Sequence, residues 1–534
     1  MNTRAATVLA ELFSDSPLRH AQFRRFYIGS IGAALGYTMQ STVAAWLMAT
    51  LTPSPFMVAL VQTASTAPAL LFGLLAGALA DIVDRRHVVL ITQSVLVASA
   101  ALLGALELAG LIGPAALLAF TFLIGTGFTI YLPAQGASTN DLVARAEIPR
   151  AVALNAVAFN VARAVGPALA GAIAAGVGSG SALLASAAFF GVMVVAVHGW
   201  HSPKRTIPGV PETIISGIES GLRYTRHSPM MRALVLHNFT FTLCASALWA
   251  LLPVIARDQL GLGAGGYGML SAGFGLGAIA SAMLVPKGLH RTSLNTMVIG
   301  AALLWLVAAL LVAWTSHTAV ALVGAFGCGA SWVGCLASLS AGTQSSAPAW
   351  VRARSVAMNL ISGQIAMAVG AALWGSVASA SGTRIALAVS AGAMLLVVAI
   401  NRYMRLKMGD EAMVTAGVMP ELVVASEPHP DDGPVLIQVE YRVDAPNQNE
   451  FLRLIRSNET VRRRNGAVDW RVFRDLAEDA RFVERFVIRS WAEYVRLRTR
   501  MTVADREIQA RIEDLQRTGV PVRVSRLIGV DLIE

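Results

Sequence analysis

The sequence predicts an all-α membrane protein with twelve transmembrane helices in two six-helix repeats, followed by a small C-terminal α+β domain. Hydrophobic residues make up 55% of the chain and charged residues only 14%, whereas charged residues reach about 25% in soluble domains. Long apolar runs follow one another along the first 405 residues, and segments 204 residues apart resemble each other. After residue 407 the composition becomes that of a soluble domain.

Twelve apolar runs support the prediction of the membrane part. A helix crosses a bilayer with about 20 mostly apolar residues, and a polar stretch from His201 to Arg232 separates six such runs from six more. The first six lie near residues 26–50, 56–80, 88–109, 113–134, 151–176 and 181–200. The second six lie near residues 231–256, 266–286, 294–314, 319–342, 353–379 and 384–404.

These runs divide the chain into six parts. In order, we expect a cytoplasmic N-terminal segment, a first transmembrane half, a cytoplasmic central loop, a second transmembrane half, a linker and a soluble α+β domain. Their predicted boundaries are residues 1–25, 26–200, 201–230, 231–405, 406–433 and 434–534.

The distribution of Lys and Arg predicts the orientation in the membrane. Up to Lys407 the chain holds 23 Lys and Arg against 10 Asp and Glu, so the net charge of +10 belongs to the membrane part. If the N-terminus is cytoplasmic, the outer turns carry only Arg257 and Arg384. Because cytoplasmic loops are enriched in Lys and Arg, both termini are predicted to be cytoplasmic. Basic residues spread between apolar runs form no nucleic-acid-binding face, so we expect no nucleic acid as a partner.

Two segments indicate an internal repeat. Ile148-Pro149-Arg150-Ala151-Val152-Ala153-Leu154-Asn155 resembles Arg352-Ala353-Arg354-Ser355-Val356-Ala357-Met358-Asn359, at an offset of 204 residues. Parallel six-helix repeats suit transporters whose halves rock about a central binding site. Further pairs at the same offset are Asn160 with Gln364, Gly166 with Gly370, Gly171 with Gly375 and Gly73 with Gly277.

The turn between the second and third spans places charges where a helix leaves its apolar run. Spaced glycines, including Gly77, precede Asp81, Asp84, Arg85 and Arg86. An ionisable group at a membrane boundary costs free energy unless it is paired, and glycines let helices approach closely. The segment is predicted to be a cytoplasmic latch between two moving halves. The alternative is a stop-transfer turn whose arginines only anchor the helix.

Arg163 lies near the middle of the fifth span, where an unpaired charge is costly. It should face the interior and meet an acid, a carbonyl dipole or an anionic substrate. Glu107 is the one acid inside a predicted span, and it lies near the outer end of the third. This shortage of acids leaves Arg163 free to attract substrate anions. Hydrogen bonding between helices is an equally supported alternative.

Other polar side chains within the spans are candidates for lining a central cavity, with interhelical hydrogen bonding as their alternative role. A histidine titrates near neutral pH, so His237 joins Asp81 and Glu107 as a candidate for proton coupling. The candidate cavity-lining residues are Gln40, Asn155, Asn160, His237, Asn238, Asn359 and Gln364.

These residues match a known family. Over roughly the first 405 residues the chain resembles the major facilitator superfamily of secondary transporters. Residues 77–86 are similar to that family's loop motif between the second and third helices, with Ile82 where Arg is usual and Asp84 where Gly is usual. The Asp variant resembles the branch of exporters similar to the enterobactin exporter.

The segment from Asn160 to Gly171 resembles the fifth-helix signature of proton-coupled antiporters. On this resemblance Arg163, Gly166, Pro167 and Gly171 form an antiporter-like motif. Pro167 removes a backbone donor and, with the two glycines, lets the helix bend and pack tightly. A structural kink without a role in gating is the alternative.

The C-terminal part predicts a ferredoxin-like domain. Strands near residues 435–443, 468–474, 482–490 and 522–530 alternate with helices near 447–464, 491–501 and 503–517, in a βαββαβ order. These segments resemble the dimeric α/β-barrel fold of small antibiotic-biosynthesis monooxygenases. They also resemble the C-terminal extension of the bacterial transmembrane secretion effectors. Residues 434–534 contain no His and no Cys, so we expect dimerisation or regulation rather than catalysis.

The sequence therefore predicts a bacterial inner-membrane exporter of a small amphipathic molecule, a siderophore-like metabolite or a drug, working by alternating access with proton antiport. The expected partners are this substrate, the lipid bilayer and a second copy through the C-terminal domain. We expect no cofactor, no metal and no enzymatic activity. The alternatives are an uptake transporter or facilitator of the same fold, and a membrane-tethered monooxygenase-like enzyme.

Overall fold

The computed structural model describes residues 16–198, 200, 214–415, 417, 424 and 426–530. Parts of the predicted N-terminal segment, central loop and linker lie outside the described residues. Contacts divide the chain into two units, which we treat separately. The first unit falls within residues 1–209, 237–338 and 361–403, and the second within 210–236, 339–360 and 404–534.

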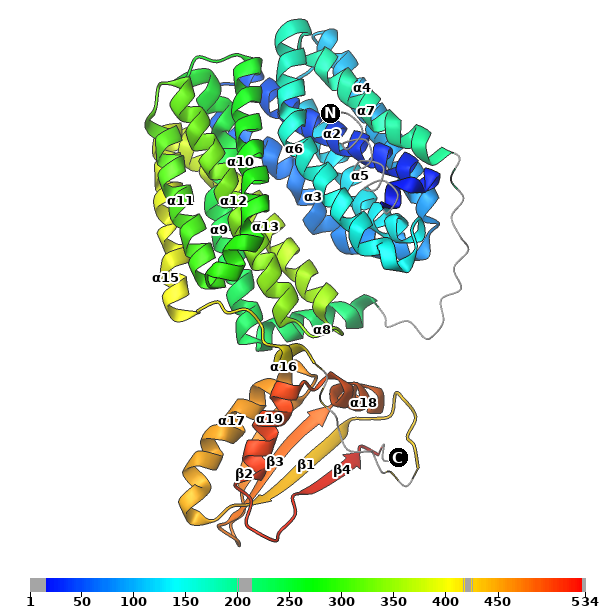
Figure 1. The fold of residues 1–534 in the computed structure, drawn as a ribbon, viewed down its shortest axis with the longest axis vertical. Helices are drawn as coiled ribbons and strands as arrows, with labels where there is room; N and C mark the ends of the chain where they lie inside the picture. The colour runs from blue at the N-terminus through cyan, green and yellow to red at the C-terminus, as the bar shows by residue number, and fades with distance from the viewer. Residues whose placement is uncertain are drawn as a thin grey trace, which may run out of the picture. The chain divides into compact units, whose positions relative to one another are not determined.

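Six long helices make up the first half of the membrane part (Figure 1). Local sequence explains where several begin, because the side chains of Ser54 and Asp84 cap α3 and α4, and Pro55 and Pro114 occupy first-turn positions. The helices are α2 (Ala21–Leu51), α3 (Pro55–Ile82), α4 (Arg85–Leu108), α5 (Pro114–Asp141), α6 (Ile148–Val177) and α7 (Ser179–His198).

The second half repeats this pattern after a shorter helix, α8 (Ile214–His227). Its last predicted run is broken at Met394 into two consecutive helices, α14 and α15. The helices are α9 (Pro229–Val254, continued by a π turn over Ile255–Gln259), α10 (Ala264–Arg291), α11 (Leu294–Trp314), α12 (Thr318–Ser346), α13 (Arg352–Ser381), α14 (Thr383–Ala393) and α15 (Leu395–Tyr403).

Eleven helical segments among the described residues are long and apolar enough to cross a membrane. They correspond to every predicted run except the first, which coincides with α2. That helix has 31 residues, but glycines and polar side chains such as Gln40 dilute its apolar content. The chain is therefore a mostly helical, multi-pass membrane protein.

Two pairs of equivalent features support the internal repeat. Gly178 ends α6 with φ +96°, and Gly382 ends α13 with φ +91°, a backbone conformation that favours glycine. Each stands at the 204-residue offset from the other. Hydrogen bonds repeat in the same way, because Asn155 Nδ2 donates to Thr139 Oγ1 (2.8 Å) and Asn359 Nδ2 to Thr343 Oγ1 (3.3 Å).

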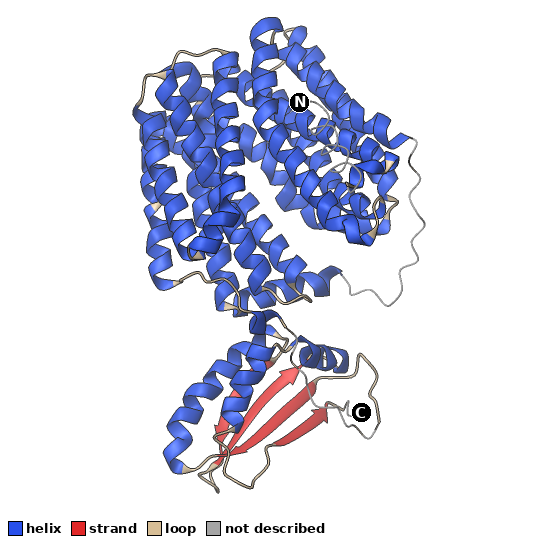
Figure 2. Cartoon of the chain, viewed as in Figure 1, coloured by secondary structure: helices blue, strands red, loops and turns tan. Residues whose placement is uncertain are grey.

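The C-terminal region holds a four-stranded antiparallel sheet in the order β2-β3-β1-β4 (Figure 2). Alternate residues of β1 are buried against helices on one face of this sheet, as its period of two requires. The elements are α16 (Glu411–Val414), β1 (Val435–Arg442), α17 (Gln448–Arg464), β2 (Val468–Arg474), β3 (Arg481–Ile488), α18 (Trp491–Arg500), α19 (Val503–Glu513) and β4 (Arg523–Ile528).

Candidate substrate-binding site

A cavity of about 390 Å³ lies in the first half, between α2, α5 and α6. Aromatic rings share its wall with amide and hydroxyl groups, the combination typical of small-molecule sites. Of the predicted lining residues, Asn155 is in this wall. The wall residues are Ser30, Ala34, Phe128, Tyr131, Leu132, Gln135, Gly136, Thr139, Val152, Asn155, Ala156, Ala158 and Phe159.

Polar groups of the cavity wall are partly satisfied by one another. Gln135 Nε2 donates to Ser30 Oγ (3.2 Å), and Asn155 Nδ2 donates to Thr139 Oγ1. Asn155 Oδ1 is buried and has no hydrogen-bond partner within the described part of the chain. Since buried polar atoms are nearly always paired, this oxygen is an acceptor available to a substrate N–H or O–H group.

Arg163 lies beside the cavity, at the middle of α6. Its guanidinium carbon is 5.3 Å from the ring centroid of Phe159, one turn earlier on the same helix and in the cavity wall. The side chain is half-buried, and no acidic side chain among the described residues forms an ion pair with it. With the aromatic face of Phe159 beside it and no described carboxylate to neutralise it, this cation remains able to bind an anion.

The fifth-helix motif sets close approaches of α6 to two neighbours. At Gly166 a Cβ atom would collide with Thr38 of α2, whose Oγ1 donates to Ala162 O (3.0 Å). At Gly171 a Cβ would lie 2.8 Å from the Cα of Gly268 in α10. Pro167 has no N–H, so the carbonyl of Arg163 lacks its helical donor.

Contacts between the two halves of the first unit gather at one end of the helices. Helix α6 meets α10 at Gly171, and α3 meets α13 at Gly375, where a Cβ would lie 2.5 Å from the Cβ of Ala59. Hydrogen bonds add to this seam, from Thr63 Oγ1 to Ala368 O (3.0 Å) and from Arg257 Nη1 to Thr52 O (3.3 Å). Together these contacts fall within residues 52–63, 164–175, 257–275 and 368–379.

The loop motif between α3 and α4 is tied to its own half. Arg85 is buried, and its Nη1 donates to Asp141 Oδ2 at the end of α5 (2.5 Å). It also donates to the carbonyls of Ala80 and Ala137. Asp84 caps α4 through the N–H of Arg86. Asp141 was missed in the sequence because the apolar run ends near residue 134, although the helix continues.

The remaining residues of the loop motif lie at the end opposite the seam. Arg86 Nη2 donates to His198 O at the end of α7 (2.7 Å). A Cβ at Gly77 would meet no described atom within 4 Å, so no described neighbour packs closely on α3 at that point. The side chain of Asp81 lies outside those that the structure describes, and its role as a latch stays a prediction.

The other predicted residues are dispersed. Gln40 is buried, Asn238 Nδ2 donates to Ser362 Oγ (3.2 Å), and Asn160 donates to its own helix at Ala156 O (2.9 Å). His237 is fully buried, and Gln364 is half-buried. Asn359 bonds Thr343, as described above. Glu107 is half-buried in the last turn of α4, beside Gly180 of α7.

Glu147, in the turn between α5 and α6, holds the beginning of α2. Its Oε1 lies 2.9 Å from Arg19 Nη2, and its Oε2 lies 3.0 Å from His20 Nε2. Partial burial raises the pKa of Glu147, but the hydrogen bond with His20 and the charge of Arg19 lower it further, to below its ordinary value. The carboxylate is therefore ionised at neutral pH.

The C-terminal region contains a buried carboxylate that is fully engaged by its own neighbours. Oε1 of Glu484 accepts hydrogen bonds from Asn458, Arg462 and Trp470, and Oε2 accepts from Tyr441. Burial lowers the pKa of Arg462, but the charge of Glu484 raises it further, to above its ordinary value. Among the described residues no three His, Cys, Asp or Glu side chains are grouped to hold a metal.

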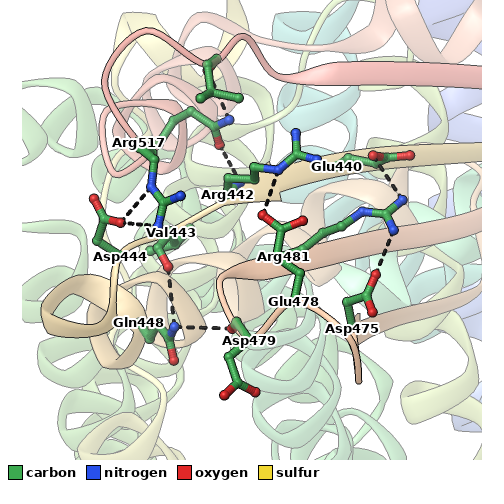
Figure 3. A network of polar contacts seen from close by, with 12 residues as sticks. Glu440, Arg442, Val443, Asp444, Gln448, Asp475, Glu478, Asp479, Arg481 and Arg517 are labelled. Carbon is green, nitrogen blue, oxygen red and sulfur yellow. Dashed lines mark hydrogen bonds and ion pairs between the residues drawn. The ribbon is translucent and has the colours of Figure 1, made fainter.

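A second network ties the ends of the strands at the surface of this region (Figure 3). Arg481 pairs with Asp475 (2.6 Å) and with Glu440 (3.1 Å), and Arg442 pairs with Glu478 (2.9 Å). A backbone N–H and the Arg481 side chain lower the pKa of Asp475 below its ordinary value. These ion pairs link β1 and β3 to the β2–β3 turn, which is a structural role.

The match to a known family covers almost the whole chain. The family described as transmembrane secretion effector matches residues 13–532. The chain belongs to this family. The family match and the helical fold together identify the chain as a transporter of the major facilitator superfamily. A transporter of this fold moves a small molecule and lies in a lipid bilayer. No curated protein is detectably similar in sequence.

Several solved structures share the fold but are distant in sequence. The nucleoside transporter NupG superposes with a TM-score of 0.58 at 14% identity, covering 72% of this chain and 100% of its own. A bacterial homolog of the human lysosomal transporter Spinster, inward-facing and occupied, gives 0.60 at 13%, covering 73% and 97%. The human organic anion transporter MFSD10 gives 0.50 at 19%, covering 71% and 98%. At these identities the likeness concerns the fold.

Proposed function

We propose that this transmembrane secretion effector is a secondary active exporter of a small amphipathic anion. The single observation that carries the proposal is Arg163, a mid-membrane cation with no described acidic partner, beside a cavity with aromatic and amide groups. The charge would bind the anionic group of the substrate, the rings of Phe128 and Phe159 its apolar part, and Asn155 Oδ1 a hydrogen-bond donor. A siderophore-like metabolite and an anionic drug both fit this description.

The proposed topology has twelve spans, with α2 counted as the first, in a bacterial inner membrane. The excess of Lys and Arg at one set of helix ends supports cytoplasmic N- and C-termini. In this orientation the end of α3 that carries Asp81 and the beginning of α4 at Arg85 are cytoplasmic. The seam at Gly171 and Gly375 is then on the outer side.

The position of that seam supports alternating access. The halves are joined at their proposed outer ends, and at the other end no described atom lies within 4 Å of a Cβ at Gly77. This supports a conformation that a substrate enters from the cytoplasm. Export then requires that the outer seam opens while the cytoplasmic ends close. The segment of Asp81, Asp84, Arg85 and Arg86 is the part of the first half that we propose takes part in that closure.

Proton antiport is the proposed energy source. The fifth-helix motif of Gly166, Pro167 and Gly171 supports it through its resemblance to antiporters. Asp81, Glu107 and His237 remain the candidates for carrying the proton. Glu107 is half-buried and His237 is fully buried, both within helices of the membrane part, where ionisable side chains mark proton relays and substrate pathways.

For the C-terminal region we propose a ferredoxin-like, non-catalytic domain that can self-associate. The sheet order with β1 between β3 and β4 supports this fold. The face of the sheet away from the helices carries the exposed apolar side chains of Val468, Phe473 and Leu527. A second copy is the partner that would cover this face.

The test is binding of a matched pair of probes to purified full-length protein, a naphthalene sulfonate and its uncharged sulfonamide. Arg163→Ala should weaken binding of the sulfonate by roughly tenfold or more, because a charge-assisted hydrogen bond is lost. Binding of the sulfonamide should change by less than about twofold. Asn160→Ala is the matched control on the same helix, since Asn160 was predicted to line the cavity but is not among its wall residues and donates to the backbone of its own helix. Equal losses for both probes would assign Arg163 to packing.

A further inference from the structure

Helix α8, which precedes the second half, is bound to the C-terminal region by two ion pairs within the second unit. Arg223 Nη2 donates to Glu493 Oε1 (2.6 Å), and Arg489 Nη1 donates to Glu219 Oε2 (2.8 Å). The two differ in burial: the side chains of Arg223 and Glu493 are 19% and 15% exposed, those of Arg489 and Glu219 63% and 52%. Only the pair of Arg223 and Glu493 is shielded enough from solvent to contribute appreciably to stability.

Glu493 is the shared anion of three arginines. Besides Arg223 it pairs with Arg500 (3.0 Å) and with Arg496 (3.5 Å). Burial raises the pKa of Glu493, but the charges of Arg500 and Arg223 lower it further, to below its ordinary value. Without this carboxylate three like charges would face one another. A neutral side chain at position 493 would therefore remove the ion pairs and also leave the three guanidinium groups to repel one another.

The same cluster reaches the turn between α12 and α13. The guanidinium carbon of Arg500 is 4.4 Å from the ring centroid of Trp350, and Tyr224 of α8 meets that ring edge-on at 5.6 Å. Arg354, in the first turn of α13, donates to Ser220 Oγ of α8 (2.8 Å). One continuous set of contacts thus joins α8, this turn and α18.

We propose that the C-terminal region is a built-in brace of the transporter, in which Glu493 positions α8 and the beginning of α13. The brace consists of Arg223, Tyr224, Trp350, Glu493 and Arg500. Helix α13 runs unbroken from Arg352 to Ser381, so the element held at one end by the brace is the one that packs on α3 at Gly375. Rigid elements of this kind transmit a constraint over their length. The inference rests on the proposed transport by alternating access.

The test uses the full chain with Glu493→Gln. Hydrogen exchange should become roughly tenfold faster in peptides covering 219–227 and 347–356, because the contacts that order them are lost. The maximal rate of naphthalene sulfonate transport should fall by at least about threefold, with its KM changed by less than about twofold, as expected for a positioning residue that does not touch substrate. Glu493→Asp, which keeps the charge, should restore part of both.

Arg489→Gln is the matched control, since it breaks the exposed ion pair of the same two elements and should leave exchange and transport near wild type. Unchanged exchange in Glu493→Gln would overturn the brace. Faster exchange with wild-type transport would overturn its positioning role. A wild-type protein that moves no sulfonate would count against the proposed function, and the exchange measurement would then test the brace alone.

Discussion

Arg85 is a buried charge of the first half that is neutralised by its neighbours. Its side chain is buried, and one carboxylate, that of Asp141, faces it together with two backbone carbonyls. Removing one partner of a buried ion pair leaves an uncompensated charge, which costs more than the pair itself contributes. The partners come from α4 and α5, so this ion pair fixes the ends of both helices.

Asp141→Asn should destabilise the protein by about 3 kcal/mol, because Arg85 keeps its charge but loses its carboxylate. The midpoint of thermal unfolding in detergent should fall by several degrees. His87→Gln is the matched control, since it breaks only the exposed contact with Asp84. Recovery of stability in the double variant with Arg85→Gln would support the assignment. An Asp141→Asn midpoint equal to that of wild type would contradict it.

For single residues, the sequence identified the charged side chains of the site better than the residues that contact them. Arg163 could be identified because a mid-span arginine is rare and costly. Phe159, which it contacts, could not, because the face of α6 that meets α2 and α5 is decided by tertiary packing. Asp141 could not be identified for another reason. Helix α5 continues beyond the predicted apolar run of 113–134, so Asp141 lies on the helix and not in the loop after it.

Among the helices, two equivalent glycines contribute close contacts to the seam between the halves. Gly171 of α6 lies against Gly268 of α10, and Gly375 of α13 lies against Ala59 of α3. Gly171 and Gly375 are equivalent in the repeat, so each half supplies the same glycine to the seam. Close approach without side chains gives a contact that closes tightly and separates readily, which suits a moving interface.

Gly375→Leu should hold α13 and α3 apart, because even a Cβ there would lie 2.5 Å from the Cβ of Ala59. On a Thr63→Cys background, we expect labelling by a membrane-impermeant thiol reagent to become several-fold faster. Gly392→Leu is the control, since a Cβ at that glycine meets no described atom within 4 Å. Native cysteines are buried and add little background. If both leucine variants label alike, Gly375 has no sealing role.

The helices and strands could be predicted from the sequence better than the points at which helices are interrupted. Spans and strands followed from apolar runs and from alternation, and in the structure Ser54, Pro55 and Pro114 stand where two of the helices begin. The interruption at Met394 leaves no mark in the sequence, because neither Pro nor a polar cluster stands there. The helices α18 and α19 follow each other closely, divided by Thr502, whose side chain begins a capping box with Asp505.

For the whole molecule, the internal repeat suits the proposed alternating access, in which one chain presents two conformations. Equivalent glycines, hydrogen bonds and helix ends recur at 204 residues, so the halves share features of their internal packing. The difference between them is chemical: Arg163 and Phe159 of the first half correspond to Met367 and Gly363 in the second. The proposed binding charge, Arg163, therefore has no basic counterpart in the second half.

The most direct test of export is flux into proteoliposomes of known orientation. In vesicles whose C-terminal region faces outward, as judged by protease access, an acidic lumen should drive accumulation of the naphthalene sulfonate. A protonophore should abolish it, and Arg163→Ala should prevent it. Sulfonate movement only toward the side of the C-terminal region, or accumulation that ignores the proton gradient, would contradict proton-driven export.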